Sequence, residues 1–161
     1  MERIEKAILR DIDLNEVMPK SKTARSPVDH WSPAVLLERA AYLRKMAKQG
    51  DGSASETLKE YPQHVAMLSF RGRSGEVEVH ERFADLFFVL AGSAILATGG
   101  VVEGARIVGP SEIRGNSIRS GEKQRLRAGD LVHVPAGTPH QMLLTGDETI
   151  TSLVMKVQEV V

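Results

Sequence analysis

The sequence contains no cysteine among its 161 residues. Disulfide bonds, thiolate metal ligands and cysteine nucleophiles are therefore excluded. An excess of positive charge is also lacking, because 21 lysine and arginine residues balance 21 aspartate and glutamate residues. Nonspecific binding to nucleic acid needs a clustered positive field, so we expect no nucleic-acid partner.

Long apolar segments are missing as well. No stretch approaches the roughly 20 apolar residues that span a bilayer, and the charged residues 1–6 lack the apolar run of a signal peptide. These absences predict a cytoplasmic protein that does not bind a membrane. The length of the chain, 161 residues, is that of a single domain with a substantial core.

A helix is predicted near the N-terminus, within a segment that we expect to precede the main domain. Ser32 is a suitable N-cap, Pro33 suits the first helical position, and Gly50 can end the helix. Apolar residues recur at helical spacing at Leu36, Ala40, Leu43 and Ala47. A further short helical turn is expected at residues 55–60, so residues 1–60 are interpreted as an N-terminal arm and helical extension.

Residues 61–161 have the pattern of an all-β domain, with short apolar runs separated by glycine-bearing turns. Strands are expected at residues 64–70, 76–81, 86–90, 94–98, 131–135, 140–144 and 149–157. Many short strands after a helical segment favour a β-sandwich or β-barrel. The glycine-rich interval 101–129 indicates an excursion beyond the minimal barrel.

Two segments carry the side chains of a possible metal site. Glu78 and His80 are spaced by two in a predicted strand, so both leave the same face, and Asp85 could bring a second carboxylate to that cavity. Further along, Gly137 lies between Pro135 and Pro139, which predicts a tight turn that aims His140 inward. Two histidines and carboxylates can form a mixed nitrogen and oxygen site for a divalent ion.

The spacing of these residues resembles the two conserved motifs of the cupin superfamily. Its first motif is Gly, five residues, His-x-His, four residues, Glu, six residues and Gly, and its second is Gly, five residues, Pro-x-Gly, two residues, His, three residues and Asn. The positions that fit this spacing are Gly72, Glu78, His80, Asp85 and Gly92 in the first motif and Gly129, Pro135, Gly137, His140 and Leu144 in the second. The chain departs from the family at Glu78, which replaces a histidine, at Asp85, which replaces a glutamate, and at Leu144, which replaces an asparagine.

The resemblance implies a cupin jelly-roll β-barrel with a short N-terminal helical extension, assembled as a homodimer. It also implies a metal site formed by Glu78, His80, Asp85 and His140, for which manganese, iron, nickel or zinc are candidates. The alternative is that the two carboxylates are solvated charges at the barrel mouth and that the histidines no longer bind metal.

Three functions are compatible with these residues. The first is a divalent-metal-dependent enzyme of the lyase or isomerase type that acts on a small oxygenated molecule. The others are a non-catalytic barrel that binds or senses a small molecule, and an iron-dependent dioxygenase. Arg82 and Arg114 are candidates to bind an anionic substrate, although surface arginines are common. The fold alone does not select among these functions.

Overall fold

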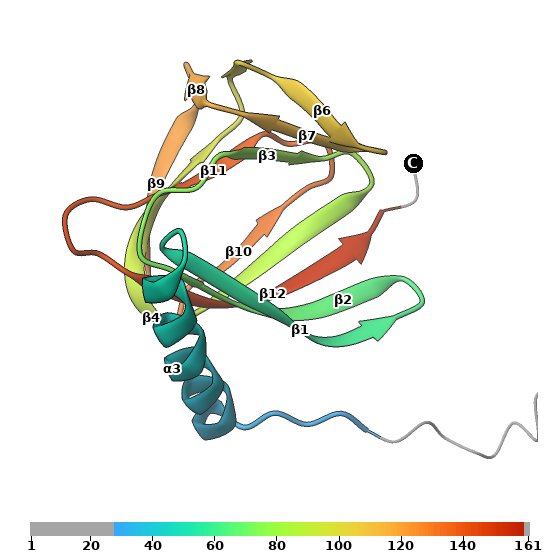
Figure 1. The fold of residues 1–161 in the computed structure, drawn as a ribbon. Coiled ribbons are helices and arrows are strands. Elements are labelled where there is room, and N and C mark those ends of the chain that lie inside the picture. The colour runs from blue at the N-terminus through green and yellow to red at the C-terminus, as the bar shows by residue number, and fades with distance from the viewer. Residues whose placement is uncertain (1–27, 160–161) are drawn as a thin grey trace, which may run out of the picture. The chain divides into compact units, whose positions relative to one another are not determined.

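The computed structural model of the chain describes residues 28–159, so residues 1–27 of the predicted N-terminal arm lie outside the described part. One helix and twelve strands are described there (Figure 1). They are α3 (Pro33–Gln49), β1 (Ser53–Tyr61), β2 (His64–Arg71), β3 (Val77–His80), β4 (Phe83–Thr98), β5 (Val101–Glu103), β6 (Arg106–Gly109), β7 (Glu112–Gly115), β8 (Ser117–Arg119), β9 (Glu122–Arg127), β10 (Leu131–Val134), β11 (His140–Leu143) and β12 (Ile150–Gln158). No helix in residues 28–159 is long and apolar enough to cross a membrane.

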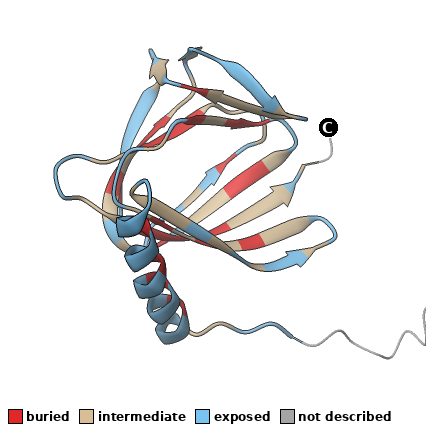
Figure 2. Cartoon of the chain, viewed as in Figure 1, coloured by how far each residue is buried: buried red, intermediate tan, exposed pale blue. Residues whose placement is uncertain are grey.

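Helix α3 has the bounds and the caps that its sequence predicts. The Ser32 hydroxyl accepts a hydrogen bond from the Val35 amide at 3.3 Å, and the Gly50 amide donates to the Met46 and Ala47 carbonyls at the other end. Its buried residues are the predicted Leu36, Ala40, Leu43 and Ala47. This face lies against β1 and β2, whereas the opposite face of the helix is exposed (Figure 2).

A curled antiparallel sheet of ten strands forms the main body, which confirms the predicted all-β jelly-roll class. Its strands follow the order β1-β2-β12-β4-β11-β3-β7-β6, and β9 and β10 also pair with β4. The first half of β4 pairs with β10 and β12, and its second half pairs with β9 and β11. The long strand β4 therefore joins the two facing halves of the sheet (Figure 1).

The structure differs from two expectations, the separation of two strands and the helical turn. Residues 86–90 and 94–98 are not separate strands but parts of β4, in which Gly92 has φ +80° and lies too close to the Thr149 carbonyl to carry a Cβ. The helical turn expected at residues 55–60 is strand β1, because its backbone pairs with β2 along the edge of the sheet. Pairing with a neighbouring strand overrides a weak local helical preference. Strand β1 belongs to the sheet although it lies before the predicted barrel start at residue 61.

The apolar core fills the space between the two halves beside the middle of β4. Its buried cluster comprises Val89, Ala94, Leu96, Leu126, Val134, Met142 and Ile150. The predicted excursion between residues 101 and 129 contains β5 and β8, which pair as a separate two-stranded sheet. The excursion also supplies β7, which pairs with β3 beside the site described next.

Candidate metal centre

Strand register brings the candidate ligands together. On β3, Glu78 is the register partner of His140 on β11, and His80 is the partner of Glu112 on β7. On the other half of the sheet, Asp85 of β4 is the partner of Lys156 on β12. Side chains from five strands therefore meet in one place, although they are separated by up to 78 residues, from Glu78 to Lys156.

These side chains line a cavity of about 460 Å³. Its charged and imidazole side chains are Arg71, Glu76, Glu78, His80, Asp85, Glu112, Arg114, His140 and Lys156. The apolar part of the wall is formed by Met67, Phe87, Val108, Met142 and Val154. A cavity of this size with a few converging polar groups is suited to a small ligand.

His80 is held by one ring nitrogen and presents the other to the cavity. Both carboxylate oxygens of Glu112 lie close to Nδ1, at 2.8 and 2.7 Å, so Nδ1–H donates to this carboxylate. The other nitrogen, Nε2, lies 3.2 Å from Glu78 Oε2 and 3.4 Å from Asp85 Oδ2. The side chain of His80 is only 4% exposed, so this orientation is fixed within the protein. A carboxylate bonded to the distal nitrogen is the usual support for a metal-binding histidine.

His140 has the same arrangement, and its inner nitrogen lacks a partner. Its Nδ1–H donates to the Thr138 carbonyl at 3.1 Å. Among the described residues, its Nε2 is the one buried side-chain nitrogen or oxygen without a hydrogen-bond partner. The predicted turn is confirmed: Gly137 has φ +75°, and its amide donates to the His80 carbonyl at 2.8 Å, which ties the turn to β3.

The carboxylates favour positive charge at the centre of the cavity. Burial raises the pKa of Glu78, yet its close contact with His80 and the charges of Arg114 and Arg71 bring it down to about 2. The pKa of Asp85 is also lowered, because its close contacts with the His140 and His80 rings and the charge of Lys156 outweigh its burial.

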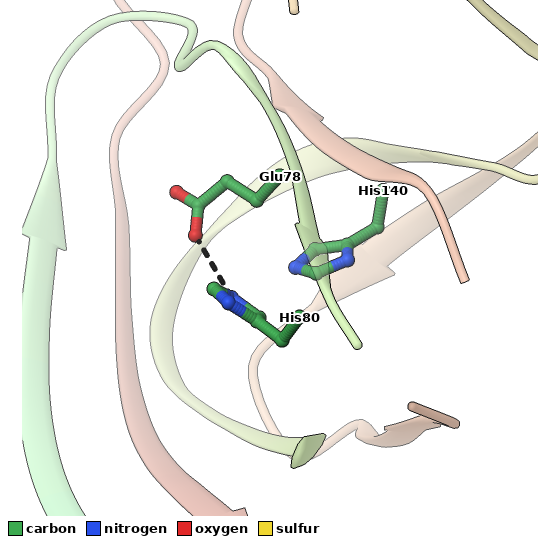
Figure 3. Close-up of side chains that lie close together, drawn as sticks. All are labelled: Glu78, His80 and His140. Atoms are coloured by element: carbon green, nitrogen blue, oxygen red, sulfur yellow. Dashed lines mark ion pairs between the residues drawn. The ribbon is translucent and has the colours of Figure 1, made fainter. Parts of the chain in front are cut away.

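Three side chains have the arrangement that a metal ion needs. One ligand atom each from Glu78, His80 and His140 lies within 4.8 Å of the other two, and Figure 3 shows these side chains pointing toward one another from β3 and β11. We call these three residues the ligand cluster. The unpartnered Nε2 of His140 offers a lone pair that no protein group uses, and two imidazoles with a carboxylate suit a divalent transition metal. The residues present therefore fit a metal ion.

Asp85 lies beside the ligand cluster, with its Oδ2 3.3 Å from Nε2 of His140. Its carboxylate is bound by Lys156, whose ammonium donates to Oδ1 at 2.9 Å and to Oδ2 at 3.1 Å. The same ammonium lies 2.8 Å from Nε2 of His80. The role of Asp85 as a fourth metal ligand stays a prediction.

The two predicted substrate-binding arginines lie in different places. Arg114 lines the cavity, with its guanidinium 3.2 Å from Glu112 and 3.8 Å from Glu78. Arg82 is exposed on the turn between β3 and β4 and is not part of the cavity wall. Its role in substrate binding stays a prediction, and the structure does not bring it to the site.

Sequence reasoning missed three charged residues of the cavity. Arg71 donates to Glu78 at 3.1 Å, Glu112 supports His80, and Lys156 lies between His80 and Asp85. Lys156 could have been predicted from the sequence. It is two residues from Val154 in an apolar strand, so both side chains leave the same face of that strand. Neither Arg71 nor Glu112 stands out in the sequence, since their contacts depend on strand pairing.

Comparison with known proteins gives a consistent picture of the fold. The family model for the cupin domain matches residues 114–156. No curated protein matches the chain.

Solved structures that resemble the chain do so at low sequence identity. One is an uncharacterised conserved protein with a double-stranded β-helix domain from Klebsiella pneumoniae, with a TM-score of 0.54, 17% identity, and coverage of 81% of this chain and 90% of that one. The TT1209 protein of Thermus thermophilus has a TM-score of 0.53 and 18% identity, and the match covers 76% of this chain and 93% of that one. A predicted oxalate decarboxylase from Thermotoga maritima has a TM-score of 0.50 and 14% identity, and the match covers 66% and 81% of the two chains. At these identities the likeness concerns the fold.

Proposed function

We propose that this chain, a member of the cupin superfamily, binds a divalent metal ion through Glu78, His80 and His140. The observation that carries the proposal is the Nε2 atom of His140, which is buried and has no hydrogen-bond partner. A buried polar atom without a partner is costly, and a metal ion would satisfy it. Asp85 is the proposed fourth ligand, because its Oδ2 lies within 3.4 Å of Nε2 of both histidines.

We further propose that the protein is an enzyme of the lyase or isomerase type acting on a small oxygenated molecule. A bound divalent ion would supply Lewis-acid polarisation of a carbonyl or hydroxyl oxygen. The guanidinium of Arg114, on the cavity wall, would bind an anionic group of the substrate. A carboxylate of Glu78 or Asp85 that is not engaged as a ligand would hold or accept a proton.

Elemental analysis tests the metal site. Untagged protein, purified without chelator or added metal, is compared with His140→Ala and with His133→Ala, a histidine on β10 whose side chain is 54% exposed. We expect near-stoichiometric manganese, iron, nickel or zinc in the wild type and in His133→Ala, and loss of that metal in His140→Ala. Wild-type protein that carries no metal and takes none up on addition would contradict the proposal.

A specific observation favours a second candidate, a metal-free barrel that binds a small molecule without catalysis. The ammonium of Lys156 lies 2.8 Å from Nε2 of His80, so the cavity already holds a cation.

The iron-dependent dioxygenase is the remaining alternative, and oxygen uptake that depends on added iron(II) would support it.

We also propose a homodimer in the cytoplasm. Phe88 and Leu131 are cross-strand partners on β4 and β10, and they are 41% and 67% exposed, so they offer apolar surface to a second copy. Light scattering coupled to size-exclusion chromatography tests this assembly. We expect twice the chain mass for the wild type and a monomer for Leu131→Glu, and a monomeric wild type would contradict the proposal.

A further inference from the structure

Lys156 lies among the atoms that would bind the metal. Its Nζ is 2.8 Å from Nε2 of His80 and 2.9 and 3.1 Å from the two carboxylate oxygens of Asp85. Strand pairing fixes this position, because Lys156 on β12 is the register partner of Asp85 on β4. The side chain is 25% exposed and also lines the cavity.

The contact with His80 uses the lone pair that a metal ion would need. Nδ1 of His80 donates to Glu112, so Nε2 is the one nitrogen that can face the cavity as an acceptor. A ring nitrogen has a single lone pair, which can accept one hydrogen bond or bind one metal ion. The Lys156 ammonium and a metal ion therefore exclude each other at this atom.

Lys156 is held in place because its ammonium compensates the buried charge of Asp85. The side chain of Asp85 is 3% exposed, and a buried carboxylate is costly without a cationic partner. The arginines of the cavity wall lie against other carboxylates, since Arg71 contacts Glu78 and Arg114 contacts Glu112 and Glu78. Among residues 28–159, the lysine or arginine that contacts Asp85 is Lys156. A divalent ion would provide the same compensation.

We infer that Lys156 is a built-in competitor of the metal ion, which binds through His80 only after the Lys156 ammonium has left His80 and Asp85. This inference rests on the proposed metal site and names the residue that regulates its affinity. The flexible four-carbon stem of lysine allows the displacement, and the adjoining cavity of about 460 Å³ can accept the displaced ammonium.

Calorimetric titration with Mn²⁺ and with Zn²⁺ tests the inference on full-length wild type, Lys156→Met and Arg114→Met. Methionine keeps much of the lysine volume but removes the ammonium. Arg114→Met removes a cation that borders the same carboxylates, 3.8 Å from Glu78, and leaves Nε2 of His80 untouched. We expect Lys156→Met to bind metal about tenfold more tightly than the wild type or better, a typical scale for groups that surround metal ligands, and Arg114→Met to tighten binding much less.

Three results would overturn the inference. Equal tightening in Lys156→Met and Arg114→Met would show that net charge alone sets the affinity. Unchanged or weaker binding in Lys156→Met, with metal bound by the wild type, would refute competition and leave the metal site intact. Absence of binding in every variant would refute both the competition and the proposed site.

One further result would support the competitor role of Lys156 and refute metal binding by the native chain. If Lys156→Met binds metal and the wild type does not, the competitor role is supported and metal binding by the native chain is refuted.

Should Lys156→Met fail to fold, Lys156→Gln is used, because its amide can still donate to Asp85 while the charge is removed. Circular dichroism of each variant confirms folding before titration.

Discussion

Glu112 on β7 accepts a hydrogen bond from Nδ1 of His80 on β3, with its two carboxylate oxygens 2.8 and 2.7 Å from that nitrogen. The two residues are 32 positions apart and meet because they are register partners in neighbouring strands. Through this bond, Glu112 sets the tautomer and the orientation of a histidine whose Nε2 faces the cavity.

Substitution of Glu112 is therefore expected to weaken metal binding without removing a ligand. We expect Glu112→Ala to reduce the affinity for Zn²⁺ by about 10- to 100-fold, the usual range for such supporting carboxylates. Glu112→Gln retains an acceptor oxygen for Nδ1–H, so its affinity for Zn²⁺ should lie closer to that of the wild type. Competition titration with a chromophoric chelator measures both affinities, and a wild-type value for Glu112→Ala would contradict the orienting role.

Glu148 is expected to make stability depend on pH in the acidic range. Hydrogen bonds from the Thr145 amide and hydroxyl, and then from Arg125, lower its pKa from 4.5 to about 2. A lowered folded-state pKa contributes stability that is present above pH 4.5 and is lost as the pH falls toward 2. The melting temperature of Glu148→Gln should therefore be lower than that of the wild type at pH 6, and this difference should be smaller at pH 3.

Thermal melts followed by circular dichroism measure that difference. The matched control is Glu122→Gln, at an exposed position of β9, for which we expect the wild-type dependence on pH. A difference between Glu148→Gln and the wild type that is equal at both pH values would show that the charge of Glu148 is not responsible.

Gly92 is expected to tolerate no side chain. A Cβ at this position would overlap the Thr149 carbonyl, and φ is +80°. Gly92→Ala should lower the free energy of unfolding by about 3 kcal/mol or more, because steric overlap adds to backbone strain. Gly146→Ala is the control, with φ +57° and open space around the added Cβ, and should cost only about 1 kcal/mol. Urea unfolding measures both, and equal costs would refute the steric argument.

The centre of the core should be equally sensitive to truncation. Leu126 is 1% exposed and belongs to the buried cluster beside β4, so Leu126→Ala should destabilise the fold by about 2–5 kcal/mol. Leu131→Ala, at a position that is 67% exposed, should change stability by less than about 0.5 kcal/mol if the chain is measured as a monomer. Urea unfolding at low protein concentration tests the pair. If Leu126→Ala lowers the free energy of unfolding by less than about 1 kcal/mol, Leu126 does not belong to the centre of the core.

Much of the local structure follows from the sequence alone. Helix α3 begins after Ser32 and ends before Gly50 because capping and apolar spacing act within a few residues of one another. The same holds for the turn at Gly137, whose flanking prolines restrict the backbone before any tertiary contact forms. His80, Glu78 and His140 could be predicted as neighbours because their spacing resembles known motifs, and the structure brings them together.

Elements whose form depends on distant partners could not be predicted in the same way. Residues 53–61 form a strand because β2 supplies their hydrogen bonds, and β4 continues through Gly92 because two sets of neighbours pair with its two halves. Glu112 and Lys156 reach the cavity through the register of β3 with β7 and of β4 with β12. The caps, the turns and the principal candidate ligands can be predicted from the chain alone, since they depend on local conformation and short spacing. The charges that surround those ligands are known only from the folded structure, because strand register sets contacts between residues far apart in the chain.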